Sequence, residues 1–171
     1  MAIIRTVKGD ISPEDLGTTL CHEHLRIELK KIFQEPAYRK NFERAYSHVT
    51  LENLGWVRAH YINNLDNLGL YEEQLVVDEV SLFKEAGGST LVEVTPVDIG
   101  RNPESLLRIA EATQLNIVMG SGYYVFGTHP IDLKVRSEDS LAEEMVNDIR
   151  QGVGDTGIQS GIIGEIGCSW P

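Results

Sequence analysis

Apolar residues in the second half of the chain follow two alternating patterns. Longer segments with an apolar residue at every third or fourth position have the helical repeat, and the short apolar runs between them are typical of buried strands. The predicted helices are 71–88, 102–115 and 137–152, and the predicted strands are "STLVEVTP", "NIVMGSGYYV" and "GIIGEIGCS". Helices that alternate with apolar strands favour a parallel sheet covered by helices.

Each predicted helix has an apolar face and recognisable ends. The first ends in the glycine pair 87–88, and the second begins with Asn102 as N-cap and Pro103 as its first helical residue. We expect the apolar faces to pack on the sheet. Their residues are Val76, Val80 and Phe83 in the first helix, Leu106, Ile109 and Ala110 in the second, and Leu141, Met145 and Ile149 in the third.

The N-terminal part of the chain is less regular. A predicted strand, "IIRTVKG", is followed by one helical turn, "SPEDLG", with Ser12 as N-cap, and then by the strand "TTLCHEHL". The segment from about 26 to 70 has a helical pattern only around 52–65. So long an excursion between two core elements usually has a function of its own or is disordered.

Two sheet architectures fit the βαβαβαβ order, an open doubly wound sheet and a closed (β/α)8 barrel. A doubly wound sheet normally has the phosphate-binding turn G-x-G-x-x-G after its first strand. This chain has "CHEHL" at that position, and "GSGYYV" after the third strand is only a partial match. The pattern alone therefore does not decide between the two architectures.

Composition and charge exclude several classes of function. The 171 residues, 42% of them hydrophobic, suffice for one packed core. The net charge of -11 repels phosphate backbones and anionic membranes, so we expect neither nucleic acid nor membrane as a partner. The sequence has neither a secretory apolar region nor an apolar run of membrane-spanning length, and its two cysteines, Cys21 and Cys168, form no CxxC motif. These features predict a soluble protein of the cytoplasm.

The pair His22 and His24 is the first candidate for chemistry. Residues two apart on a strand point to the same side, so the two imidazoles converge while Cys21 and Glu23 face the other way. Imidazole nitrogens are good ligands for zinc and similar cations. The alternative is a pair of hydrogen-bonded histidines at a strand end.

Glu165 is the second candidate, because it stands within an apolar predicted strand. A carboxylate buried in a strand is costly unless it is paired or binds a metal. If Ile163, Glu165 and Gly167 share the inward face, the carboxylate points to the same axis as the histidines. The alternative is a Glu paired with a buried Arg or Lys.

Four motifs together resemble the phosphotriesterase family of the amidohydrolase superfamily. They are "GTTLCHEHL", "TPVDIGRN", "GSGYYV" and "GIIGEIGCSWP", in this order over nearly the whole chain. The likeness is to its phosphotriesterase-related, or resiniferatoxin-binding-protein-like, branch. The resemblance implies a (β/α)8 TIM barrel with its active site at the carboxyl ends of the strands. Residues 1–171 then form the N-terminal half of one barrel domain, strands 1 to 4, with a long insertion at about 26–70.

The resemblance also implies a site with two divalent metal ions, zinc being expected and manganese, iron or cobalt fitting the same ligands. His22 and His24 would bind the more buried ion, and Glu165 would bridge the two. Tyr124 would stand near a bridging hydroxide, with the adjacent Tyr123 as the alternative. That hydroxide would attack an ester, lactone, phosphoester or amide, because coordination lowers the pKa of water to about 7.

The family pattern includes two later histidines and an aspartate that this sequence does not contain. We therefore expect the chain to need a second half or a second copy for turnover. Three functions stay open: a metal-dependent hydrolase of a small molecule, a small-ligand binding protein without chemistry, and a half-barrel that assembles with a complement.

Other titratable residues are expected to have ordinary roles. We interpret His48, His60 and His129 as loop or surface histidines, although His129 could line the pocket. Cys168 should face the helices as a buried apolar residue. Basic residues of the insertion could instead form a positive rim that steers an anionic substrate; these are Lys30, Lys31, Arg39 and Lys40.

Overall fold

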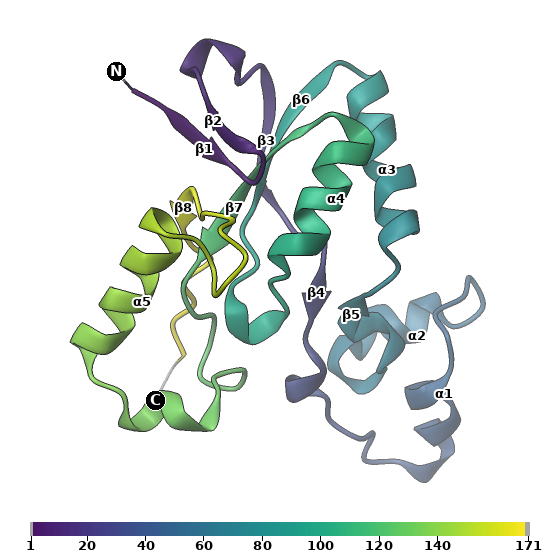
Figure 1. Cartoon of the computed structure of the whole chain (residues 1–171). Helices are drawn as coiled ribbons and strands as arrows, with labels where there is room; N and C mark the ends of the chain where they lie inside the picture. Colours follow the sequence, from purple (N-terminus) through teal and green to yellow (C-terminus); the bar gives the residue numbers. More distant parts are fainter. Residues whose placement is uncertain (1, 170–171) are drawn as a thin grey trace.

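The computed structural model describes residues 2–169 and contains a four-stranded parallel sheet. Its strands are β3 (Thr18–Glu23), β6 (Gly88–Glu93), β7 (Asn116–Ser121) and β8 (Ile162–Ile163), in the order β3-β6-β7-β8. The sheet curls, and the helices lie along its outer side (Figure 1). The fold is thus half of a (β/α)8 barrel, as the resemblance predicted, and not an open doubly wound sheet.

Three helices connect these strands close to the predicted positions. They are α3 (Glu73–Glu85), α4 (Pro103–Thr113) and α5 (Glu138–Arg150). The predicted N-cap of α4 is confirmed, because the Asn102 side chain accepts the Ser105 backbone N–H at 2.9 Å. Ser137 caps α5 in the same way through the Ser140 N–H. These local bonds satisfy N–H groups that have no partner within the helix.

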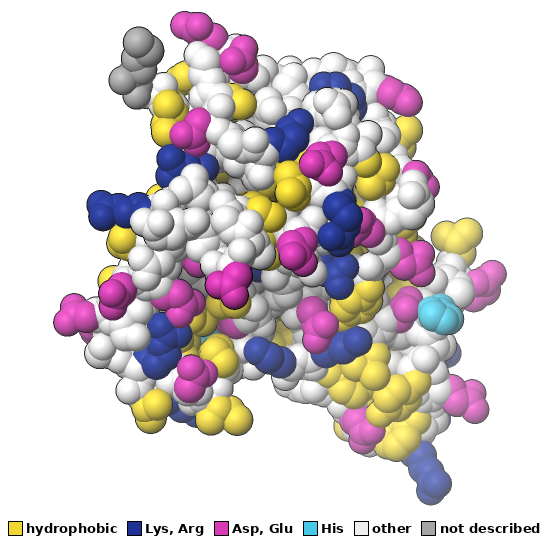
Figure 2. All heavy atoms as spheres, in the orientation of Figure 1, with side chains coloured by type: hydrophobic (Ala, Val, Ile, Leu, Met, Phe, Trp, Pro, Cys, Tyr) yellow, Lys and Arg dark blue, Asp and Glu magenta, His cyan; other side chains and the backbone are white. Residues whose placement is uncertain are grey.

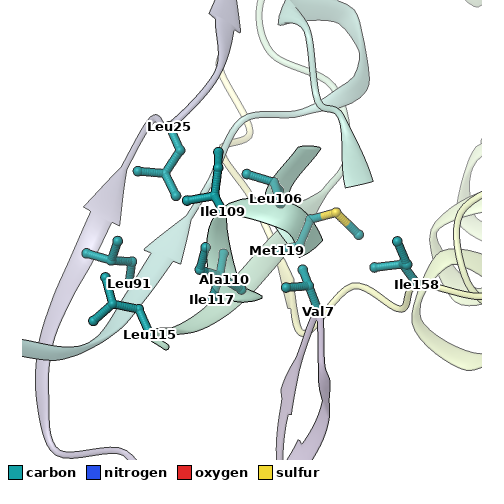
Figure 3. Packing of buried hydrophobic residues seen from close by; sticks show 10 residues of the cluster. All are labelled: Val7, Leu25, Leu91, Leu106, Ile109, Ala110, Leu115, Ile117, Met119 and Ile158. Carbon is teal, nitrogen blue, oxygen red and sulfur yellow. The ribbon is translucent and has the colours of Figure 1, made fainter. Parts of the chain in front are cut away.

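The hydrophobic core lies between the sheet and the helices (Figure 3). Ile117 and Met119 of β7 are two residues apart, so they share one face of the strand, and both are fully buried. Leu106 and Ile109 of α4 pack in the same cluster, together with Leu91 of β6. The predicted apolar face of α4 is therefore the one that the sheet buries.

The predicted first strand is one arm of a hairpin. Strand β1 (Ile4–Thr6) pairs antiparallel with β2 (Gly9–Ile11), and the Val7 N–H at the turn donates to the Ile117 carbonyl at 2.9 Å. The following 3-10 helix η1 (Pro13–Asp15) has Ser12 at its N-cap position, but the Ser12 side chain makes no capping bond. The predicted helical turn, with Ser12 at the N-cap position and Pro13 as its first residue, is therefore confirmed, and it forms without a side-chain cap.

The segment between β3 and α3 forms small elements of its own. Strands β4 (Ile27–Glu28) and β5 (Gly69–Leu70) pair antiparallel at its base. The predicted helix around 52–65 is split into the helix α2 (Leu54–Ala59) and a 3-10 turn. The remaining elements are α1 (Phe42–Tyr46) and the 3-10 helices η2 (Lys30–Ile32), η3 (Arg39–Asn41), η4 (Tyr61–Asn63) and η5 (Asp66–Leu68).

Buried polar bonds hold the middle of this segment. Asn64 is fully buried, and its side-chain amide donates to the carbonyls of Arg44 and Ser47 at 2.6 and 2.9 Å.

On the face shown in Figure 2, acidic and basic side chains are interspersed, and hydrophobic side chains gather at the lower right, over residues 26–70. Within residues 2–169, none of the helices has the length and apolar character needed to cross a bilayer.

The last predicted strand is much shorter than expected. Strand β8 pairs with β7 only through Gly120 with Ile162 and Ser121 with Ile163. The chain then turns across the sheet, where backbone bonds to other partners replace strand pairing. Cys168 is exposed instead of facing the helices as a buried residue, so that prediction is wrong.

Candidate metal centre

Two elements bring three potential ligands together at the carboxyl ends of the strands. His22 lies near the end of β3, His24 follows it, and Glu165 follows β8. Glu165 Oε2 lies 3.3 Å from His24 Nε2 and 3.7 Å from His22 Nε2. The three ligand atoms all lie within 4.8 Å of one another. Residues 141 positions apart in the chain thus converge as predicted, but Glu165 lies beyond β8 and not on the inward face of a strand.

Glu165 reaches the histidines because the segment after β8 passes over β7. The Gly164 N–H donates to Ser121 O at 2.8 Å, and the Glu165 N–H donates to Val94 O, beyond β7, at 2.7 Å. A Cβ at Gly120 would overlap with the Gly164 carbonyl oxygen. Glycine at position 120 therefore permits the close approach that carries the carboxylate toward β3.

The donor set and its spacing fit a divalent cation. Imidazole nitrogen and carboxylate oxygen bind zinc at about 2.0–2.2 Å, so two ligands of a tetrahedral site are about 3.4 Å apart. The two distances from Glu165 Oε2 to the histidine nitrogens, 3.3 and 3.7 Å, are close to this spacing. Glu165 is half-buried, so the prediction of a fully buried carboxylate is corrected, because the inner side of the half-barrel is open.

The surroundings of His24 favour the neutral form of its imidazole. Burial lowers the pKa of His24, and the nearby His22 acts in the same direction, while the charge of Glu165 opposes the shift. Its second ring nitrogen, Nδ1, lies 2.9 Å from Thr95 Oγ1. If Nδ1 donates to this hydroxyl, the other ring nitrogen of the neutral imidazole is available as a ligand.

A second carboxylate, Glu93, lies near the site and was missed by the sequence analysis. It is fully buried, and burial raises its pKa to about 7, although bonds from Thr95 and Leu25 favour the ionised form. Glu93 stands in the apolar strand "STLVEVTP" just as Glu165 stands in "GIIGEIGCS". The argument applied to Glu165 would have found it.

The two adjacent tyrosines face different surroundings. The Tyr123 hydroxyl donates to Glu144 Oε1 at 2.7 Å and accepts from Arg136 at 2.9 Å, and burial raises its pKa to about 12. Burial also raises the pKa of Tyr124, followed in size by the negative charge of Glu165. Tyr123 is thus engaged by residues in and before α5, whereas Tyr124 lies within the electrostatic reach of the candidate centre.

Two of the four predicted rim cations are engaged elsewhere. Lys31 donates to the carbonyls of Thr128 and Asp98 at 2.7 and 3.3 Å, and the Lys30 ammonium lies 4.5 Å from the centre of the Tyr71 ring. These contacts bind the insertion to neighbouring loops. Arg39 and Lys40 are exposed in η3.

The remaining histidines stand apart from the three-residue group. His48 Nδ1 lies 2.9 Å from an Asp66 oxygen, and the His60 ring stacks on Trp56. His129 packs edge-on against Tyr123 and Phe126, and its Nε2 atom is buried without a hydrogen-bond partner among the described residues.

Comparisons with known proteins identify the family and the fold of the chain. A model of the phosphotriesterase family matches residues 2–171. A phosphotriesterase-related protein of Nematostella vectensis and an N-acetyltaurine hydrolase of Xenopus tropicalis are each 40% identical over 170 residues; these cover 98% of this chain and 49% and 48% of the respective relatives. A crystal structure of a resiniferatoxin-binding protein from Rhodobacter sphaeroides matches with a TM-score of 0.93 and 34% identity, covering 96% of this chain and 46% of that protein.

A parallel half-barrel with two histidines and a carboxylate at the carboxyl ends of its strands defines the class, that of TIM-barrel proteins with candidate metal ligands at this end of the barrel. Within that class, the chain belongs to the phosphotriesterase family, so the resemblance predicted from four motifs is confirmed. The chain spans about half the length of the relatives that it matches.

Proposed function

We propose that this chain supplies the His22, His24 and Glu165 ligands of a two-metal hydrolase that cleaves a small amide or ester. The observation that carries the proposal is the convergence of the three ligand atoms within 4.8 Å of one another. Bound divalent cations, with zinc as the first candidate, would supply Lewis acidity and activate water for attack. The name of the Xenopus relative favours an N-acylated amine as the substrate class.

The residues of the chain have distinct roles in this proposal. Burial lowers the pKa of His24 and so favours its neutral imidazole, the form that has a nitrogen lone pair for a cation. Glu165 would supply negative charge that offsets the charge of bound cations. Tyr124 keeps its phenolic proton, since its pKa is raised, and can donate a hydrogen bond on the Glu165 side of the site.

The first test is the metal content of the purified chain. Wild type is compared with His22→Ala and Glu165→Ala, and His60→Ala serves as the matched control because its exposed imidazole stacks on Trp56. We expect bound zinc in wild type and His60→Ala and its loss in the other two variants. Equal zinc in all four proteins would contradict the assignment of these ligands.

A second candidate, a binding protein without chemistry, is favoured by the name of the Rhodobacter relative. Turnover of an N-acyl substrate that disappears on chelation and returns with added zinc would decide for the hydrolase. Ligand binding that persists after chelation, with no turnover in the complete barrel, would decide for the binding protein.

We also propose that turnover needs a complementary half-barrel. Ile163 and Ile166 are 55% and 53% exposed, and a groove of about 990 Å³ runs beside the edge strand β3, lined by Leu25 and by Val76 and Val80 of α3. Apolar surface and an open strand edge are the features that further barrel strands would cover. Molar mass in solution, with and without the C-terminal half of a relative, tests this; restored turnover on mixing is the expected result.

A further inference from the structure

Two buried polar side chains connect His24 to the interior of the protein. Thr95 and Glu93 have no exposed surface. His24 Nδ1 lies 2.9 Å from Thr95 Oγ1, and the same hydroxyl oxygen lies 2.5 Å from Glu93 Oε1. Glu93 Oε1 also accepts the backbone N–H of Leu25, the residue after His24, at 3.2 Å.

The number of protons in this chain of contacts determines its direction. The Thr95 hydroxyl has one proton and two acceptor lone pairs. Glu93 Oε1 accepts two hydrogen bonds, one from the Leu25 backbone N–H and one from the Thr95 hydroxyl. Thr95 Oγ1 is then left as an acceptor, so the proton of this contact comes from His24 Nδ1.

We propose that Thr95, oriented by Glu93, is a positioning residue that keeps the neutral His24 ring protonated on Nδ1. The Nε2 lone pair is thereby directed at the space between His22 and Glu165, 3.3 Å from Glu165 Oε2. The inference rests on the proposed metal site. It explains why the buried carboxylate of Glu93 is present at the end of β6. Glu93 Oε2 has no hydrogen-bond partner within residues 2–169. A buried carboxylate oxygen without a partner lowers stability, and the positioning of Thr95 gives a reason for keeping the carboxylate there.

The tautomer can be observed without any metal. Imidazole nitrogen chemical shifts, measured by NMR on the metal-free chain at a pH above the ordinary histidine pKa, distinguish Nδ1–H from Nε2–H. We expect the His24 signals of wild type to report Nδ1–H. In Thr95→Val, which removes the hydroxyl and nearly keeps the shape, we expect a shift toward Nε2–H, and in Thr95→Ser a return to the wild-type pattern.

Zinc affinity provides the second readout. Loss of a group that orients a ligating histidine typically lowers metal affinity 10- to 100-fold. We expect a loss of that size in Thr95→Val and wild-type affinity in Thr95→Ser. The matched control is Thr113→Val, because Thr113 is another buried threonine, and its hydroxyl donates to Ile109 within α4. It should lower stability without changing either readout.

Changes at Glu93 test the direction of the contacts. Glu93→Gln retains an oxygen that can accept from Thr95 and Leu25, so the Nδ1–H tautomer should persist. Glu93→Leu releases the Thr95 proton toward His24 and should favour Nε2–H. If this variant does not fold, the Thr95 variants still decide.

Unchanged His24 signals in Thr95→Val would overturn the positioning role, whether or not zinc binds. A shifted tautomer in a chain that binds no zinc at all would support the positioning contact and would contradict the proposed function. The two proposals therefore fail in different measurements.

Discussion

The two faces of the sheet differ in how completely the chain covers them. On the outer face, Leu106 and Ile117 have no exposed surface and pack in one cluster with the helices. At the inner side and the strand ends, Ile163 and Ile166 are more than half exposed, and the polar groups His24, Glu93 and Glu165 gather. The outer layer therefore accounts for most of the burial that stabilises the chain, and the inner side and strand ends hold the candidate metal ligands.

This difference implies that stability and metal binding can be changed separately. Apolar burial depends on the packed helix layer, while cation affinity depends on a few donors and the groups that orient them. Substitutions on the outer face should lower the free energy of unfolding and leave zinc affinity unchanged. Substitutions at the strand ends should do more to affinity than to stability.

The largest effect on stability is expected for Leu106→Ala in the outer layer. Leu106 is fully buried, and truncation of a buried leucine leaves a cavity and costs roughly 3 kcal/mol. Urea denaturation measures the loss, and zinc titration of the folded protein should give wild-type affinity. Leu82→Ala on α3, where the side chain is 59% exposed, is the control and should cost far less. A parallel fall in zinc affinity in Leu106→Ala would show that the two faces are coupled.

An intermediate effect is expected for Gly120→Ala, which acts on both properties. The added methyl group meets the Gly164 carbonyl, so the segment that carries Glu165 must move. Overpacking of this kind costs about 1–3 kcal/mol, and displacement of Glu165 should lower zinc affinity about 10-fold or more. Gly55→Ala in α2 is the control, because a methyl group added there would meet no neighbouring side chain or loop within 4 Å. Wild-type zinc affinity in Gly120→Ala would disprove the account of how Glu165 reaches the histidines.

The smallest effect is expected for Glu73→Gln, at the solvent edge of the helix layer. Hydrogen bonds from Arg108 and Ser105 lower the pKa of Glu73 to about 2. The Arg108 side chain is 56% exposed, so solvent screening makes the contribution of this ion pair to stability small.

The pH dependence of this variant has a definite sign. The folded pKa of Glu73 is below its unfolded value of 4.5, so its stabilisation is complete above pH 4.5 and is lost as the pH falls toward 2. The difference in unfolding free energy between wild type and Glu73→Gln should shrink over that interval. Glu79→Gln, at an exposed position of the same helix, is the control, and a pH-independent difference would contradict the ion-pair explanation.

Local patterns in the sequence were sufficient for the helices and for the first part of the site. The side chain of Asn102 caps α4 through a residue three positions away, and the apolar face of α4 follows a short-range repeat. His22 and His24 share a side of a strand for the same local reason. Such features depend on neighbours along the chain, which the sequence displays directly.

Contacts between distant residues were decided by the tertiary structure alone. Thr95 meets His24 across 71 positions, Lys31 meets Thr128 across 97, and Glu165 crosses β7 only because Gly120 has no side chain. The short β8 and the separate surroundings of Tyr123 and Tyr124 have the same origin. A periodic pattern specifies which side of its own element a residue occupies, whereas a partner from another element is determined only when the elements pack.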